Sequence, residues 1–175
     1  MRVFGPIATA VVFACGFVAA ANAAGTLVFT TIDVPGAVLT SAQGINRQDD
    51  IVGSYTDAAG KSHGFLRSGG QYRTIDFPNS RASVARGIND SGDIVGSYQR
   101  DSDPPGGIPS HGFLLTRRGG LQTIDYPGHL NTIPQHILAD GTILGCYHDT
   151  DTMPEVARIG HKRTAEQRFR TLDRS

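Results

Sequence analysis

The sequence contains the stretch Gly87-Ile88-Asn89-Asp90-Ser91-Gly92-Asp93-Ile94-Val95-Gly96-Ser97-Tyr98, in which two short apolar segments are separated by turn residues. Segments that are rich in β-branched and aromatic residues and bounded by Gly, Asn and Asp are typical of strands. Asn89 is suited to open a type I turn, and Gly92 is suited to the left-handed conformation that closes it. The stretch therefore predicts a β-hairpin.

Near-copies of this stretch lie on both sides of it. Gly44-Ile45-Asn46 and Ile51–Tyr55 lie 43 residues earlier, and His136-Ile137-Leu138 and Ile143–Tyr147 lie 49 residues later. In place of Gly92 the copies have Asp49 and Gly141, and both residue types tolerate a positive φ better than most. Self-similarity at such a period is the signature of a repeat architecture.

Two further motifs recur in the same order. His-Gly-Phe-Leu begins at His63 and His111, and Thr-Ile-Asp-x-Pro begins at Thr31, Thr74 and Thr123, with a partial copy at Thr171-Leu172-Asp173. The motif starts are 43, 49 and 48 residues apart. The longer second spacing is explained by 101–109, which has the composition of an inserted surface loop. We place the repeats near 31–73, 74–122 and 123–170, with a degenerate carboxyl-terminal end.

Each repeat is predicted to hold four strands, and no helical pattern is present. Ile51 and Val52 are adjacent, so they lie on opposite faces of a strand and both faces must be covered. The predicted fold class is all-β, with about three four-stranded antiparallel repeats in a β-propeller-like arrangement, as a partial propeller or as stacked blades. The glycines at 53, 96 and 145 would allow close approach of an adjacent sheet or a local bulge. Because closed propellers have four to eight blades, self-association to complete a ring or capping strands would have to cover the end faces.

The ordered set of four motifs resembles the HAF-type extracellular repeat family of exported bacterial proteins. The resemblance covers roughly Thr31 to Tyr147, and Gly64 and Gly112 replace the alanine of the family's His-Ala-Phe motif. From Thr150 onward the pattern largely fails, and Val156–Ile159 is a stand-in for the missing His-Gly-Phe block. The resemblance implies export and a propeller-like β architecture, and it brings no catalytic residues.

The amino-terminal residues 1–23 read as a secretory signal peptide that ends in Ala21-Asn22-Ala23, which leaves 24–175 as the β-repeat domain. An uncleaved anchor and a lipoprotein with lipid at Cys15 are the alternatives. The predicted location is secreted or periplasmic, with no membrane span after cleavage. The chain has 16 basic and 16 acidic residues, a balance that gives no reason to expect a nucleic acid partner.

The recurrent polar residues allow a chemical and a structural interpretation. In a ring, Asp33, Asp76, Asp125 and Asp173 would form a circle of carboxylates that could hold a cation, but each is more simply an acceptor for turn backbone. His63 and His111 are likewise interpreted as structural, because residues at equivalent places in repeats diverge around an axis. Cys146 replaces Ser54 and Ser97, so it is expected to be a buried, inert thiol.

Several features remain as candidate sites. The acidic turns, at 90–93, 101–103 and 149–151, lack the pattern of a calcium-binding EF-hand. The basic tail, 158–174, would suit an anionic polymer or is a frayed last repeat. The inserted loop breaks the repeat spacing, so Asp101 and Asp103 are the predicted ligand-binding residues. No catalytic residue, metal or cofactor is predicted.

The sequence favours an exported, non-catalytic binding or scaffolding module. Its expected partners are a second copy of the chain and a glycan or cell-surface ligand. A secreted glycan hydrolase that uses the recurrent Asp residues is the alternative, as is a truncated, functionless paralogue.

Overall fold

The structure, a computed structural model, describes residues 27–104, 109–148, 155–160 and 168–171, and from residue 148 onward it describes the backbone alone. Every regular element among these residues is a strand, so the all-β prediction is confirmed. The described residues from Thr31 onward belong to one compact unit. The predicted signal peptide, 1–23, lies outside the described residues.

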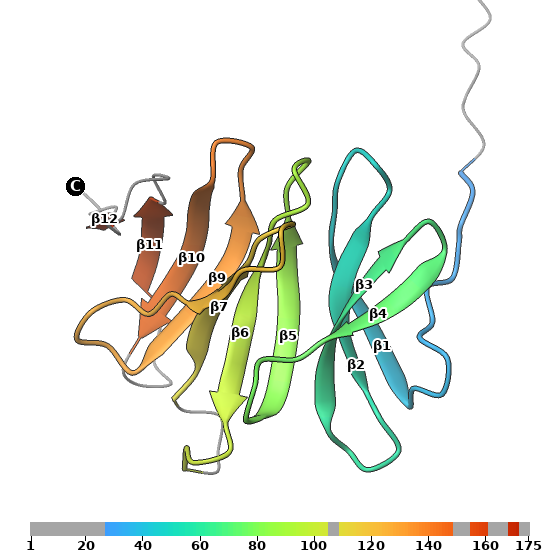
Figure 1. Ribbon diagram of the computed structural model, residues 1–175, viewed down its shortest axis with the longest axis horizontal. Helices are drawn as coiled ribbons and strands as arrows, with labels where there is room; N and C mark the ends of the chain where they lie inside the picture. Colours follow the sequence, from blue (N-terminus) through green and yellow to red (C-terminus); the bar gives the residue numbers. More distant parts are fainter. Residues whose placement is uncertain (1–26, 105–108, 149–154, 161–167, 172–175) are drawn as a thin grey trace, which may run out of the picture. The chain divides into compact units, whose positions relative to one another are not determined.

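The described strands form three groups of four, and within each group every strand pairs antiparallel with the next strand in the chain (Figure 1). We call these groups the first, second and third sheets. The first contains β1 (Leu39–Ile45), β2 (Ile51–Thr56), β3 (Ser62–Ser68) and β4 (Gln71–Ile75); the second contains β5 (Ser80–Ile88), β6 (Ile94–Arg100), β7 (His111–Leu115) and β8 (Leu121–Thr123); the third contains β9 (Asn131–Ile137), β10 (Thr142–His148), β11 (Glu155–Gly160) and β12 (Arg168–Thr171).

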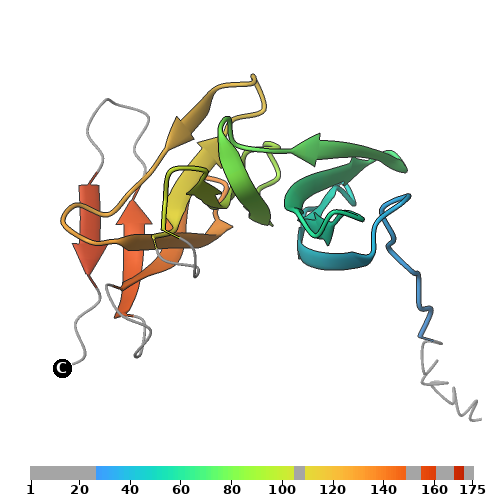
Figure 2. The same cartoon turned by 90° about the horizontal axis from the view of Figure 1, so that it is seen from below.

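One parallel β-bridge connects each sheet to the next. Ser62 of β3 pairs with Ala82 of β5, and this one bridge joins the first two sheets into an eight-stranded sheet. The equivalent bridge joins Ser110, just before β7, to Asn131 of β9. We call the first strand of each sheet, β1, β5 or β9, its inner strand. The inner strands β5 and β9 therefore begin beside the third strand of the preceding sheet (Figure 2).

The Thr-Ile-Asp motif lies at the end of a sheet and not at its start. Thr74 and Ile75 close β4, Thr123 closes β8, and Thr171 closes β12. After β4 and β8 the chain turns at Pro78 and Pro127 and begins the next sheet. Residues 31–35, which have the same motif, form no strand.

The predicted hairpin turn is confirmed in all three sheets. Asp49, Gly92 and Gly141 have φ angles of 60°, 82° and 82°, as expected for the residue that closes the turn. In the second sheet the Gly92 N–H donates to the Asn89 carbonyl over 3.0 Å.

The glycines at 53, 96 and 145 lie opposite bulges. The strand register shifts between Ala85 and Gly87 on β5, and a Cβ on Gly96 would overlap the Val84 carbonyl oxygen of that strand. The close neighbour thus belongs to the same sheet, which agrees with the bulge interpretation.

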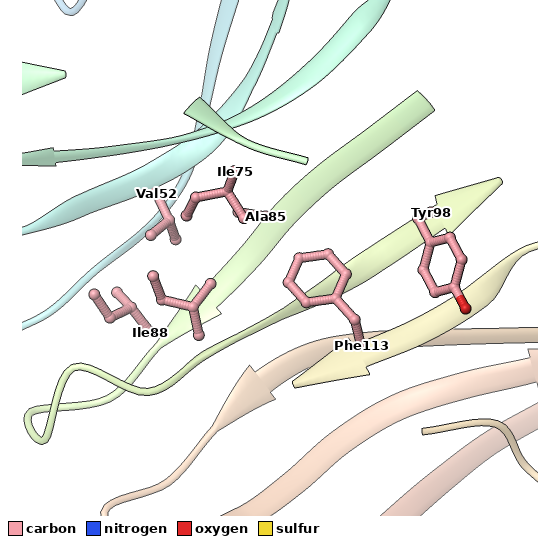
Figure 3. Packing of buried hydrophobic residues seen from close by; sticks show 7 residues of the cluster. Val52, Ile75, Ala85, Ile88, Tyr98 and Phe113 are labelled. Atoms are coloured by element: carbon pink, nitrogen blue, oxygen red, sulfur yellow. The ribbon is translucent and has the colours of Figure 1, made fainter. Parts of the chain in front are cut away.

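The second sheet packs between the other two. Val52 and Ile75 of the first sheet pack against Ala85, Ile88 and other residues of the second sheet in one buried cluster (Figure 3). The opposite face of the second sheet forms a separate cluster with the third sheet, made of Val95, Leu114, Ile124, Ile137 and Ile143. Burial on both faces was the reason for expecting stacked sheets, and the second sheet meets that condition.

Candidate functional site

The two recurrent polar residues of the first sheet, His63 and Asp76, contact each other. The β3 strand presents His63 beside the end of β4, where its Nδ1 lies 2.8 Å from Asp76 Oδ2. Its Nε2 lies 3.2 Å from Oδ2 of Asp57, in the turn before β3. The Asp57 carboxylate also accepts the Lys61 N–H over 2.8 Å. The Lys61 N–H and the His63 ring hold the pKa of Asp57 below its ordinary value.

Tyr55 and Thr74 complete this cluster. The Tyr55 ring stacks on His63 with 5.0 Å between centroids, and its hydroxyl lies 2.9 Å from Thr74 Oγ1. Three motifs thus meet in one sheet: the tyrosine of Ile-Val-Gly-x-Tyr, the histidine of His-Gly-Phe-Leu, and the threonine and aspartate of Thr-Ile-Asp. We call this set of residues the motif cluster.

The second sheet repeats the motif cluster. His111 Nδ1 lies 2.7 Å from Asp125 Oδ2, while Asp125 Oδ1 accepts the Gly112 N–H over 3.0 Å. The Tyr98 hydroxyl lies 2.7 Å from Thr123 Oγ1. We expected the recurrent aspartates to accept hydrogen bonds from nearby turn backbone, but the backbone donor to Asp125 is Gly112 in strand β7. The histidine partner of Asp125 was missed.

Of the two predicted ligand-binding residues, Asp103 is turned inward and Asp101 is exposed. The Asp103 carboxylate accepts the Arg100 N–H over 2.6 Å and lies 3.6 Å from His111 Nε2 with 9% of the side chain exposed. It therefore takes the place that Asp57 has beside His63. The Asp101 N–H donates to Asn79, and its role as a ligand-binding residue stays a prediction. The centre of the loop, 105–108, lies outside the described residues.

The motif cluster does not have the arrangement of a nucleophilic triad. In such a triad one histidine nitrogen faces a carboxylate and the other faces a hydroxyl or thiol. Here both nitrogens of His63 face carboxylates, and so do both nitrogens of His111. Each cluster therefore joins the second, third and fourth strands of one sheet, while the buried Nε2 of His111, 3.6 Å from Asp103, makes no hydrogen bond.

A second set of polar contacts links one sheet to the next. Asn46 Nδ2 donates to the Asn89 carbonyl over 3.2 Å, and Asn89 Nδ2 donates to the Leu138 carbonyl over 3.2 Å. These three residues occupy the same place in successive repeats, so we call the contacts the asparagine ladder. The amide oxygen of each asparagine also stabilises its own hairpin. Asn89 Oδ1 accepts the Asp93 N–H over 2.9 Å, and Asn46 Oδ1 accepts the Asp50 N–H over 2.9 Å.

The inner strands approach each other closely beside this ladder. A Cβ on Gly44 would lie 2.8 Å from the Arg86 carbonyl oxygen, and a Cβ on Gly87 would lie 2.6 Å from that of Gln135. Real side chains do not tolerate such contacts with backbone, so only glycine fits at these two places. The equivalent residue of the third sheet is His136, which is exposed.

Cys146 is buried and free, as predicted. Gln135 Nε2 lies 3.7 Å from its sulfur. Nearby, Arg86 Nε donates to Ser97 Oγ over 3.3 Å, and burial lowers the pKa of Arg86.

The outer face of the first sheet exposes apolar side chains. Ile45 is 61% exposed, whereas Ile88, the equivalent residue of the second sheet, is 8% exposed. Leu39 on the same strand is also exposed, but it pairs with Thr56, which lies on the same face of β2 as Val52, so it belongs to the other face of the sheet. Because scattered apolar residues are normal on protein surfaces, the informative observation is the difference between equivalent positions.

The described residues contain no group of three His, Cys, Asp or Glu side chains that could hold a metal ion. Among the same residues, no helix is long and apolar enough to cross a membrane. The predicted acidic turn at 149–151 lies outside the described residues, and of the predicted basic tail at 158–174 the structure describes only the backbone of 158–160 and 168–171.

The chain is thus an all-β protein with sheets linked by recurrent polar contacts. Comparisons with protein-family models, with curated proteins and with solved structures found no match.

Proposed function

We propose that the protein is an exported, non-catalytic β-repeat protein, and that its propeller-like stack of sheets serves as a binding or scaffolding module. The observation that carries this proposal is the outer face of the first sheet, where Ile45 is exposed while its counterpart Ile88 is buried between sheets. An apolar face of this kind is suited to contact with another macromolecule. The resemblance of the motifs to HAF-type repeats agrees with export.

The contacts that the recurrent histidines, aspartates and asparagines make also favour binding over catalysis. An active site needs several different groups that converge on a reacting atom. The histidines and aspartates of the motif clusters instead contact each other inside one sheet, and the asparagines contact the neighbouring sheet. The recurrent residues therefore account for the architecture, and the exposed end of the stack remains for function.

A glycan array and a broad glycosidase screen on the purified protein test the proposal. We expect saturable binding of a glycan or cell-surface ligand, or of a protein partner in a separate binding assay, without turnover of any glycan. Reproducible hydrolysis by the purified protein would contradict the non-catalytic function.

The alternative, a secreted glycan hydrolase, has one observation in its favour. Asp57 and Asp76 both lie beside His63, and paired carboxylates carry out glycoside hydrolysis. If this alternative holds, Asp76→Asn abolishes turnover in a variant that keeps its thermal stability. If the non-catalytic function holds, the screen finds no turnover in either form.

A further inference from the structure

The interface between the first and second sheets provides a template for the missing neighbour of the first sheet. On the second sheet, Ala85, Ile88 and Ile94 are buried in the cluster shared with the first sheet (Figure 3). Their counterparts on the first sheet are Ala42, Ile45 and Ile51, of which two are exposed and one is half-buried. The first sheet thus carries the residues of an inter-sheet interface but has no preceding sheet on that face among the described residues.

Residues 31–35 have the sequence of the last strand of that missing sheet. In the complete sheets this motif bonds to the tyrosine and histidine of its own sheet, as Thr74 does to Tyr55 and Asp76 to His63. It also connects to the next sheet, since the Phe77 N–H donates to Ser83 Oγ over 3.0 Å.

Residues 31–35 keep only the second of these links. The Val34 N–H donates to Thr40 Oγ1 over 3.1 Å, whereas Thr31 and Asp33 have no hydrogen bond to a tyrosine or histidine of the described residues. Residues 31–35 form no strand. The described residues therefore include the sequence motif of a fourth strand and its attachment to the first sheet, but no three strands that precede it.

The opposite end of the stack cannot supply those strands. Each sheet is attached to the following one by two residues near the end of its inner strand. A glycine allows the inner strand of the following sheet to come close, and an asparagine side chain donates to the backbone carbonyl of the equivalent residue in that sheet. The third sheet has His136 and Leu138 at these places. A histidine side chain is too large for the close approach of two inner strands. A leucine side chain has no N–H group to donate a hydrogen bond, so the asparagine ladder ends at Leu138, which is 55% exposed.

We propose that the outer face of the first sheet, together with residues 31–35, is a docking site for a repeat sheet of another protein that presents Gly-Ile-Asn on its inner strand. This inference rests on the proposed binding function and names its partner. The asparagine of the partner donates to the Asn46 carbonyl, its glycine admits the inner strand of the first sheet, and its tyrosine and histidine bind Thr31 and Asp33. A second copy of this chain does not fit, because its two Gly-Ile-Asn motifs are already used between its own sheets.

A donor variant of the chain itself tests this docking site. In the donor, His136→Gly and Leu138→Asn restore the interface on the third sheet, and Ile45→Asp disables its own docking face. We expect wild-type protein to sediment as a monomer when alone and to form a one-to-one complex with the donor. The matched control, which carries Ile45→Asp alone, should form no complex with wild type.

The docking face is tested from the other side by substitutions in the acceptor. An acceptor with Ile45→Asp should bind the donor more than about tenfold more weakly, because a charge then has to be buried against apolar side chains. An acceptor with Leu144→Asp, on the third sheet, should bind the donor as wild type does.

Two results would overturn the proposal. One is a folded donor that forms no complex with wild type; the other is a wild-type dimer that Ile45→Asp abolishes, because a second copy would then occupy the face. If the first donor does not fold, a second donor in which 123–170 is replaced by another copy of 74–122 presents the natural Gly-Ile-Asn sequence. Glycan hydrolysis would refute the non-catalytic function and leave the sedimentation result unaffected, so the two failures are distinguishable.

Discussion

The side-chain amide of Asn46 donates a hydrogen bond to the backbone carbonyl of Asn89, the residue that holds the same place one repeat later. Asn89 makes the same contact with Leu138. A single residue type thereby closes a hairpin with its amide oxygen and attaches the next sheet with its amide nitrogen. This double use explains why the Gly-Ile-Asn motif recurs where sheets meet and is lost in the third sheet, where no further sheet follows among the described residues.

The Asn89→Asp variant tests the ladder. A carboxylate keeps the acceptor for the Asp93 N–H, but it removes the donor to the Leu138 carbonyl and places a negative charge beside that oxygen. Because Asn89 is buried, we expect a loss of about 1–3 kcal/mol in the free energy of unfolding. Urea unfolding followed by circular dichroism measures it.

The same change at Asn46 is the control. Asn46 is half-buried, so water can solvate the carboxylate of Asn46→Asp and the loss should be smaller than at Asn89. Equal stability of Asn89→Asp and wild type would show that the inter-sheet hydrogen bond contributes nothing.

The Asp125→Asn variant separates a structural from a catalytic role of the recurrent aspartates. Asp125 accepts from the Gly112 N–H and lies 2.7 Å from His111 Nδ1, so we expect the variant to lose about 1–3 kcal/mol of stability. Thermal and urea unfolding measure the loss.

Asp33→Asn is the matched control for Asp125→Asn. Asp33 has the same motif position but no hydrogen bond to a histidine of the described residues, and it is exposed. We expect its stability to stay within about 0.5 kcal/mol of wild type. If both variants had the stability of wild type, the motif cluster would have no structural role.

The strands and their turns were predictable from the sequence because their signals are local. Asp49, for example, stands where Gly92 stands in the next repeat, and the comparison alone predicted its positive φ of 60°. The burial of Cys146 followed in the same way from the serines at equivalent places.

Contacts between motifs were not predictable in the same way. His63 and Asp76 were considered separately, because their contact depends on the register of β3 against β4. Their nearly constant separation in both repeats, 13 and 14 residues, is a signal that could have linked them. The inward position of Asp103 also depends on a tertiary contact, since it takes the place of Asp57 from a loop of different length.

The low pKa of Asp57 predicts a specific response to acid. The Lys61 N–H and the His63 ring hold this pKa below its ordinary value of 3.8. A carboxyl whose pKa is lowered by folding contributes stability that is present above its ordinary pKa and is lost as the pH falls through the lower pKa of the folded protein. We therefore expect the melting temperature of wild type to fall more steeply below about pH 4 than that of Asp57→Asn, which cannot take up this proton.

The control for this pH dependence is Asp101→Asn, which removes an exposed carboxylate. Its melting temperature should follow that of wild type throughout the titration. Melting curves recorded by circular dichroism at a series of acidic pH values measure all three proteins. If wild type and Asp57→Asn lost stability in parallel below about pH 4, Asp57 would not be a source of the acid sensitivity, and its hydrogen bonds with Lys61 and His63 would be as strong to the protonated as to the ionised carboxyl.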